Sequence, residues 1–190
     1  GQLTNPANWN TSVSGSGTVG CCRPTFFNNP LDTFEVQCNM VLTDTVAWRV
    51  AGTVIMSGSG FIFRPANVTP DTLSVGRAFI MKSGTRIFSA FNTLSPFAIE
   101  LYGDVDMGTN TGILSAASTG VGGAAFGKSY AHVYLCDTNA NFFAPKTIKF
   151  TSDTVWNKYT NFIFNRGCYR KLLSDLPSPS FANQADLLLG

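Results

Sequence analysis

Alternation of apolar and polar residues with a period of two is the feature that most constrains what this chain can fold into. In the segment TFEVQCNMVLT the apolar positions are Phe34, Val36, Cys38, Met40 and Leu42. Successive side chains of a strand point to opposite faces of its sheet, so this pattern predicts a strand over residues 32–42 with one buried face. Cys38 is expected on that buried face as a small apolar side chain.

The same alternation continues along the chain. One buried face is predicted to contain Trp48, Val50, Gly52, Val54 and Met56, and another Phe97, Ile99 and Leu101. SGSG at residues 57–60 and KSGT at residues 82–85 separate apolar runs in the manner of hairpin turns.

About nine or ten short strands at a spacing of roughly 8–12 residues are typical of an all-β sandwich or barrel. We therefore expect an antiparallel two-sheet β-sandwich of jelly-roll type. No internal repeat is recognised, which disfavours a propeller or a solenoid. Residues 1–20 are predicted to form an extended polar lead-in, a shaft junction in one interpretation, and residues 21–190 a single head domain.

Charge excludes several classes of partner. Charged residues make up 13% of the 190 residues, about half the usual share. The net charge of +2 is not gathered into a basic cluster, so nucleic-acid binding is not expected. No apolar run approaches the roughly 18 residues of a membrane-spanning helix, and GQLTNPANWN has no features of a signal peptide. Because the sequence starts without Met, we expect either an excised domain of a longer chain or a tagged protein.

The cysteines do not predict a metal site or a disulfide framework. They are Cys21, Cys22, Cys38, Cys136 and Cys168. Their number is odd, their spacing is irregular and no CxxC pair is present, so we expect free thiols and no bound metal or other cofactor. An inter-chain or long-range disulfide is the alternative.

Catalytic chemistry is not expected. His132 is the single histidine and is predicted to share a strand face with Tyr134 and Cys136, but no motif supplies a third group to orient it. Glu100 is predicted to point outward, and Asp104 and Asp106 are predicted to begin a loop. We interpret these three carboxylates as a solvated acidic patch rather than as a glycosidase pair. The chain is therefore predicted not to be an enzyme.

Two aromatic residues are the candidates for binding. Trp156 and Tyr159 in DTVWNKYTN follow a turn signal, where aromatic rings stack on sugars or fill interfaces. The alternative is that both rings pack at the edge of a strand.

Low charge, abundant Phe and many Ser, Thr, Asn and Gly residues in a compact all-β body resemble the heads of viral fibres and spikes, or projecting capsid domains. The lead-in LTNPANWNTS before a β-rich block is similar in arrangement to a shaft-to-head junction, as in adenovirus-like fibre heads. The Thr-Leu-Trp pattern of adenovirus shafts is absent, so no functional residue is carried over. The resemblance implies an attachment domain on the virion surface that binds a host receptor, protein or glycan, without catalysis.

The surface chemistry also favours a homo-oligomer. The chain has 24 aromatic and 24 charged residues, so a single core of this size leaves apolar surface to cover. A trimer is expected, with a pentamer as the alternative, through residues 108–127 and 181–189. The alternative function is a carbohydrate-binding β-sandwich module of an extracellular or surface protein.

Overall fold

The computed structural model describes residues 3–9, 27–42, 47–64, 72–89, 97–115, 131–135, 145–150, 160–164, 170–173 and 187–189. These residues form one short 3-10 helix, η1 (Pro6–Asn8), and 16 strands in three sheets. Every strand pair in the three sheets is parallel.

In each of the following strand orders, adjacent strands are hydrogen-bonded to each other. Sheet 1 contains β1 (Thr33–Val36), β4 (Thr53–Met56), β7 (Ala78–Met81), β10 (Asp104–Met107), β13 (Lys146–Lys149) and β15 (Arg170–Leu172). Sheet 2 contains β11 (Gly112–Ser115), β8 (Arg86–Ser89), β5 (Phe61–Arg64) and β2 (Asn39–Val41). Sheet 3 contains β16 (Leu187–Leu189), β14 (Thr160–Phe164), β12 (Ala131–Leu135), β9 (Phe97–Leu101), β6 (Thr72–Val75) and β3 (Trp48–Val50).

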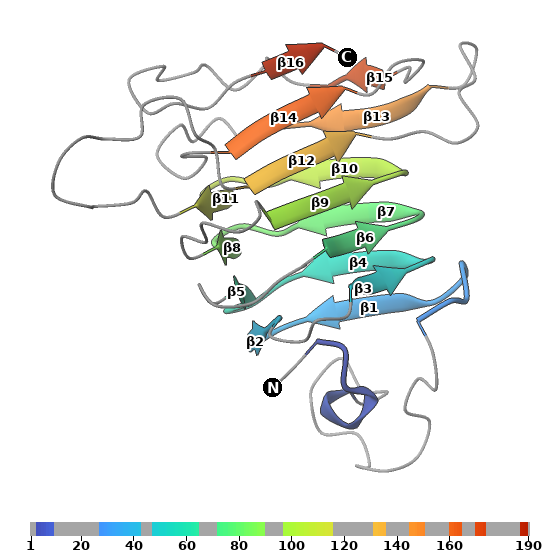
Figure 1. Ribbon diagram of the computed structural model, residues 1–190, viewed down its shortest axis with the longest axis vertical. Helices are drawn as coiled ribbons and strands as arrows, with labels where there is room; N and C mark the ends of the chain where they lie inside the picture. The colour runs from blue at the N-terminus through green and yellow to red at the C-terminus, as the bar shows by residue number, and fades with distance from the viewer. Residues whose placement is uncertain are drawn as a thin grey trace, which may run out of the picture.

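The order of the strands along the chain defines a parallel β-helix. Each of the first four coils contributes one strand to sheet 1, then one to sheet 2, then one to sheet 3, before the next coil begins on top of it. Figure 1 shows these coils stacked from β1–β3 at one end of the molecule to β15 and β16 at the other. Each strand is therefore hydrogen-bonded to the equivalent strand of the neighbouring coils.

The core consists of stacked rows of inward side chains. In-register pairing places equivalent residues of successive coils next to one another. Buried rows are Phe34, Val54, Phe79, Val105 and Ile148 in sheet 1 and Met40, Ile62, Ile87 and Ile113 in sheet 2. The alternation in the sequence predicts these inward residues correctly, because alternate residues of each strand point inward. In-register pairing then keeps equivalent residues on the inward face in every coil.

A sequence repeat accompanies the coils. Met56, Met81 and Met107 occupy equivalent positions at the end of their sheet 1 strands. Each Met is followed by a turn of small and polar residues and then by a sheet 2 strand whose second residue is a buried Ile. The segments are MSGSGFIF, MKSGTRIF and MGTNTGIL. The expectation that no internal repeat exists, and with it the argument against a solenoid, was wrong.

The turns between sheets 1 and 2 repeat in geometry as well. Thr85 and Thr111 are fully buried, and each donates its hydroxyl to the backbone carbonyl three residues earlier, at 2.7 and 2.8 Å. The residues just before them, Gly84 and Asn110, have positive φ values of 84° and 52°. Gly and Asn adopt this left-handed conformation at the least cost, which explains their placement.

The first coil is covered by aromatic packing. Trp9 stacks on Trp48 with ring centroids 5.5 Å apart, and its indole Nε1 donates to the Leu3 carbonyl at 2.9 Å. Phe27 and Phe34 meet the same indole edge-on. The Leu3 amide donates to the Val41 carbonyl at 3.0 Å, so residues 3–9 lie against β2 and over the end of the core.

The predicted antiparallel two-sheet jelly roll was wrong: the sheets are three and parallel. The segments SGSG and KSGT were predicted as hairpin turns, but they are corners that pass the chain from sheet 1 to sheet 2. Both kinds of turn require small residues and positive φ, so the composition of a turn does not reveal whether the next strand returns antiparallel or moves to another sheet.

The single strand predicted over residues 32–42 is divided into β1 and β2. Cys38 lies in the corner between them and is an exposed free thiol, so its predicted place in the core was wrong. The corner breaks the alternation, and the buried face resumes at Met40. The inward positions predicted for Phe34, Val36, Met40 and Leu42 are confirmed.

Candidate functional site

The outer face of sheet 3 collects polar side chains from coils far apart in the sequence. Parallel register places Arg49, Ser74, Glu100 and Tyr134 in one row across β3, β6, β9 and β12. They alternate with buried residues, so the row faces outward. The outward position predicted for Glu100 is confirmed.

Arg49 and Glu100 form an ion pair across the strand between them. Their side chains approach to 3.2 Å although β3 and β9 are separated by β6. Two strand spacings amount to about 9.6 Å, which only long side chains can bridge. Ser74 lies between them in the row and is 8% exposed, consistent with cover from the two long side chains.

His132 and Tyr134 extend this polar surface on β12. His132 Nδ1 and the Tyr134 hydroxyl are 3.2 Å apart, and the two rings meet edge-on with centroids 6.0 Å apart. Burial lowers the pKa of His132 below its ordinary value, so the imidazole is neutral at pH 7. The predicted shared face of these two residues is confirmed. We call Arg49, Glu100, His132 and Tyr134 the sheet 3 cluster.

The strand that carries His132 and Tyr134 is also where the coils depart from their regular length. In the first three coils the chain passes from sheet 2 to sheet 3 through residues 42–47, 65–71 and 90–96, whereas the connection before β12 is about twice as long and covers residues 116–130. The chain passes from sheet 3 to sheet 1 through the short segments 51–52, 76–77 and 102–103, whereas the connection after β12 covers residues 136–145. Insertions in repeat proteins often mark the face that binds, which draws attention to this strand.

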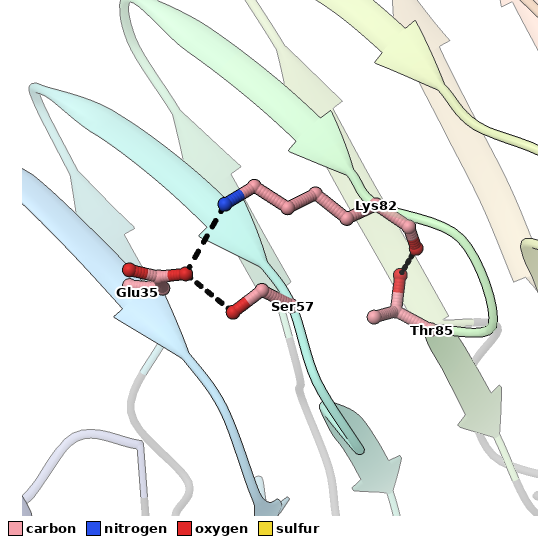
Figure 2. A network of polar contacts seen from close by, with 4 residues as sticks. All are labelled: Glu35, Ser57, Lys82 and Thr85. Atoms are coloured by element: carbon pink, nitrogen blue, oxygen red, sulfur yellow. Dashed lines mark hydrogen bonds and ion pairs between the residues drawn. The ribbon is translucent and has the colours of Figure 1, made fainter. Parts of the chain in front are cut away.

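A second polar network links three successive coils on sheet 1 (Figure 2). Glu35 of β1 accepts a hydrogen bond from Ser57, which follows β4, and lies 3.4 Å from Lys82 Nζ, which follows β7. The hydrogen bond from Ser57 lowers the pKa of Glu35; burial opposes this, and the positive charge of Lys82 adds to it. In the same view, the Thr85 hydroxyl donates a hydrogen bond to the Lys82 carbonyl.

The geometry of this second network indicates a structural role. Ser57 is buried and directs its hydroxyl to a carboxylate that also pairs with an ammonium. Nucleophilic serine needs a neighbouring base and access for a substrate, and a buried hydroxyl offers no such access. The contacts instead join β1, β4 and β7 at their common corner.

The other predicted acidic residues are separated from Glu100. Asp104 and Asp106 lie on β10 of sheet 1, not in a loop as predicted. Asp104 accepts hydrogen bonds from the Thr147 amide and hydroxyl at 2.7 and 2.9 Å, and Asp106 lies 3.3 Å from Lys149. Both contacts join β10 to β13 along the stack.

The remaining candidates fall outside the described residues: Trp156, Tyr159, Cys21, Cys22, Cys136 and Cys168. Within the part of the chain that is described, no three His, Cys, Asp or Glu side chains are grouped to hold a metal ion. Nor does any described helix have the length and apolar character needed to cross a membrane.

Sequence reasoning did not find Arg49 as a member of the sheet 3 cluster. Its contact with Glu100 depends on the stacking of coils, and the Met repeat is the signal that would have aligned the two positions. Comparison with protein-family models, with curated proteins and with solved structures found no match to this chain.

Proposed function

We propose that this chain is a non-enzymatic recognition protein, an attachment or capsid-surface domain that contacts a host-cell receptor through the outer face of sheet 3. The observation that supports this is the sheet 3 cluster, in which the Arg49–Glu100 ion pair and the His132–Tyr134 pair lie on one outer face, with Tyr134 next to Glu100 in register. Repeat architectures provide extended faces of this kind for binding.

The proposal includes a homo-oligomer on the virion surface, with a trimer as the expected state. Its support is chemical: only 24 of 190 residues are charged. On sheet 2, Phe61 and Phe88 lie on the face opposite to that of the buried Ile residues of their strands, and their ring centroids are 6.5 Å apart. Light scattering after size-exclusion chromatography measures the state directly, and a monodisperse monomer at tens of micromolar would remove this part of the proposal.

The recognition role is tested with fluorescently labelled protein on a panel of cultured animal, plant and bacterial cells. The test variant is Tyr134→Ala, and the matched control is Lys149→Ala, which removes an exposed ion pair on sheet 1. Truncation of a binding hot spot costs about 2 kcal/mol or more, which corresponds to roughly a 30-fold loss of affinity.

We expect saturable binding to at least one cell type, a large loss with Tyr134→Ala and little change with Lys149→Ala. Circular dichroism and melting temperature verify that both variants are folded. Absence of binding to every cell type, or equal binding by both variants, contradicts the proposal.

A further inference from the structure

We infer that the sheet 3 cluster binds a neutral glycan, an inference that rests on the proposed function and names the chemical class of its partner. Three properties of the cluster support it: its charge, its hydrogen-bonding groups and its extent.

The cluster carries no net charge. Arg49 and Glu100 neutralise each other at 3.2 Å, and His132 is uncharged at pH 7 because burial lowers its pKa. Binding of nucleic acid or another polyanion requires several unpaired basic side chains, which the described residues of this face do not supply. An apolar partner is equally unsuited, because the cluster presents a guanidinium, a carboxylate, an imidazole and a phenol.

A sugar ring matches these groups. Each hydroxyl of a sugar both donates and accepts hydrogen bonds, while the C–H groups of the ring form an apolar face. Arg49 provides several N–H donors in one plane and has a side chain that is 64% exposed, and Glu100 provides acceptors at 27% exposure. Tyr134 lies next to Glu100 in register, and its half-buried ring and that of His132 combine an apolar body with a polar tip.

The length of the row fits more than one sugar. From β3 to β12 the row crosses three strand spacings, about 14 Å. A short oligosaccharide laid along the stack would reach Arg49, Glu100 and Tyr134 together. The two lengthened connections lead into and out of β12, at the same end of this row.

The single histidine offers a test that needs no substitution. Because the chain contains one His, the imidazole ring proton on Cε1 gives one NMR signal from the sheet 3 cluster. The wild-type protein is screened on an array of neutral, sialylated and sulfated glycans, and each ligand found is titrated while this signal is followed. We expect neutral oligosaccharides to bind, to shift the His132 signal saturably, and to bind equally at low and high salt.

Variants and treated cells complete the experiment. Glu100→Gln keeps the shape of the side chain and removes its charge, so we expect at least a tenfold loss of glycan affinity. Asp106→Asn makes the same chemical change on sheet 1 and should leave affinity unchanged. Enzymatic removal of neutral cell-surface glycans should abolish cell binding, whereas protease treatment should leave binding to glycolipids.

The outcomes separate this inference from the proposed function. Cell binding that survives deglycosylation and is lost after protease treatment would overturn the glycan assignment while leaving recognition in place. Binding only to sulfated or sialylated glycans, with steep salt dependence, would overturn it too, as would a ligand that leaves the His132 signal unmoved. Absence of any cell or glycan binding overturns both.

Discussion

Arg49 and Glu100 are 51 residues apart in the sequence, yet their side chains form a 3.2 Å ion pair that passes over the strand between them. The contact requires three coils in parallel register, with a small side chain at Ser74 in the middle position. The same register places Tyr134 next to Glu100. The sheet 3 cluster is therefore a product of stacking, and its members come from separate repeats.

The stability of the protein should fall as the pH drops through the titration of His132. Burial lowers the folded-state pKa, so the unfolded chain takes up a proton first, near its ordinary value of about 6.5. The contribution of neutral His132 to the stability of the fold is present above the unfolded-state pKa and is lost as the pH falls through the folded-state pKa. Urea unfolding at a series of pH values from 7.5 to 5 measures this, and His132→Gln should flatten the profile in that window. An unchanged profile in the variant would contradict the role given to burial.

Glu35 should control a separate, more acidic window. Its folded-state pKa is lowered by the Ser57 hydrogen bond and by Lys82, so its contribution is present above its ordinary value and lost as the pH falls below it. We expect urea unfolding to show Glu35→Gln less stable than wild type at pH 7, with the difference shrinking towards pH 3. Asp106→Asn, at an exposed ion pair, should change stability by less than about 1 kcal/mol at either pH.

Two glycines should respond differently to substitution. A Cβ on Gly103 would lie 1.6 Å from the Arg77 carbonyl oxygen of the neighbouring coil, so Gly103→Ala must push the coils apart. Gly84 has open space around it but a φ of 84°, so Gly84→Ala should cost only the left-handed conformation, about 1–2 kcal/mol.

Gly84→Asn should cost less than Gly84→Ala, because Asn110 occupies the equivalent turn position with positive φ. Chemical denaturation of the three variants should give the order Gly103→Ala, Gly84→Ala, Gly84→Asn from most to least destabilised. Any other order would show that the turns or the coil contact are misassigned.

Neighbouring residues at the end of β1 should also differ sharply. Val36 is buried and Gln37 is only half-buried, so Val36→Asp should lower stability by about 3–5 kcal/mol through an unpaired buried charge, while Gln37→Asp should have little effect. Thermal unfolding compares the two variants, and equal melting temperatures would contradict this register.

The corner thiol should be reactive in the folded protein. Cys38 is exposed, so a thiol reagent should modify it without denaturant, and Cys38→Ser should remove that rapid reaction. Mass spectrometry of the labelled peptides identifies the modified position. If Cys38 reacted only after the protein was unfolded, it would lie in the core, and its placement in the corner between β1 and β2 would be contradicted.

The sequence predicted which residues face the core but not which strands are neighbours. Phe34, Val36, Trp48 and Ile99 were assigned correctly, because a period of two places alternate residues inside whether strands are parallel or antiparallel. The pairing depends on the turns, and the Gly and Ser residues at 57–60 suit a hairpin and a corner equally. Alignment of Met56, Met81 and Met107 would have revealed the coil.

The candidate site was predictable only within one strand. His132 and Tyr134 were placed on one face from their spacing of two positions, and the structure agrees. Their relation to Arg49 depends on the length of every connection between β3 and β12, which local patterns do not determine. Cys38 shows the same limit, because the corner at that point interrupts an alternation that otherwise continues into β2.

Cross-linking across sheet 3 tests the parallel stack, on which both proposals depend, most directly. Thr72 of β6 pairs with Ala98 of β9 in register on the outer face, where the Cβ atoms of neighbouring strands lie about 5 Å apart. In the double variant Thr72→Cys and Ala98→Cys, we expect mild oxidation to form a disulfide between these positions, identified by mass spectrometry of the linked peptides. The control pair Thr53→Cys and Ala98→Cys lies on two different sheets and should remain unlinked. Linkage of the control pair, or none between positions 72 and 98, would contradict the parallel stack and the surface built on it.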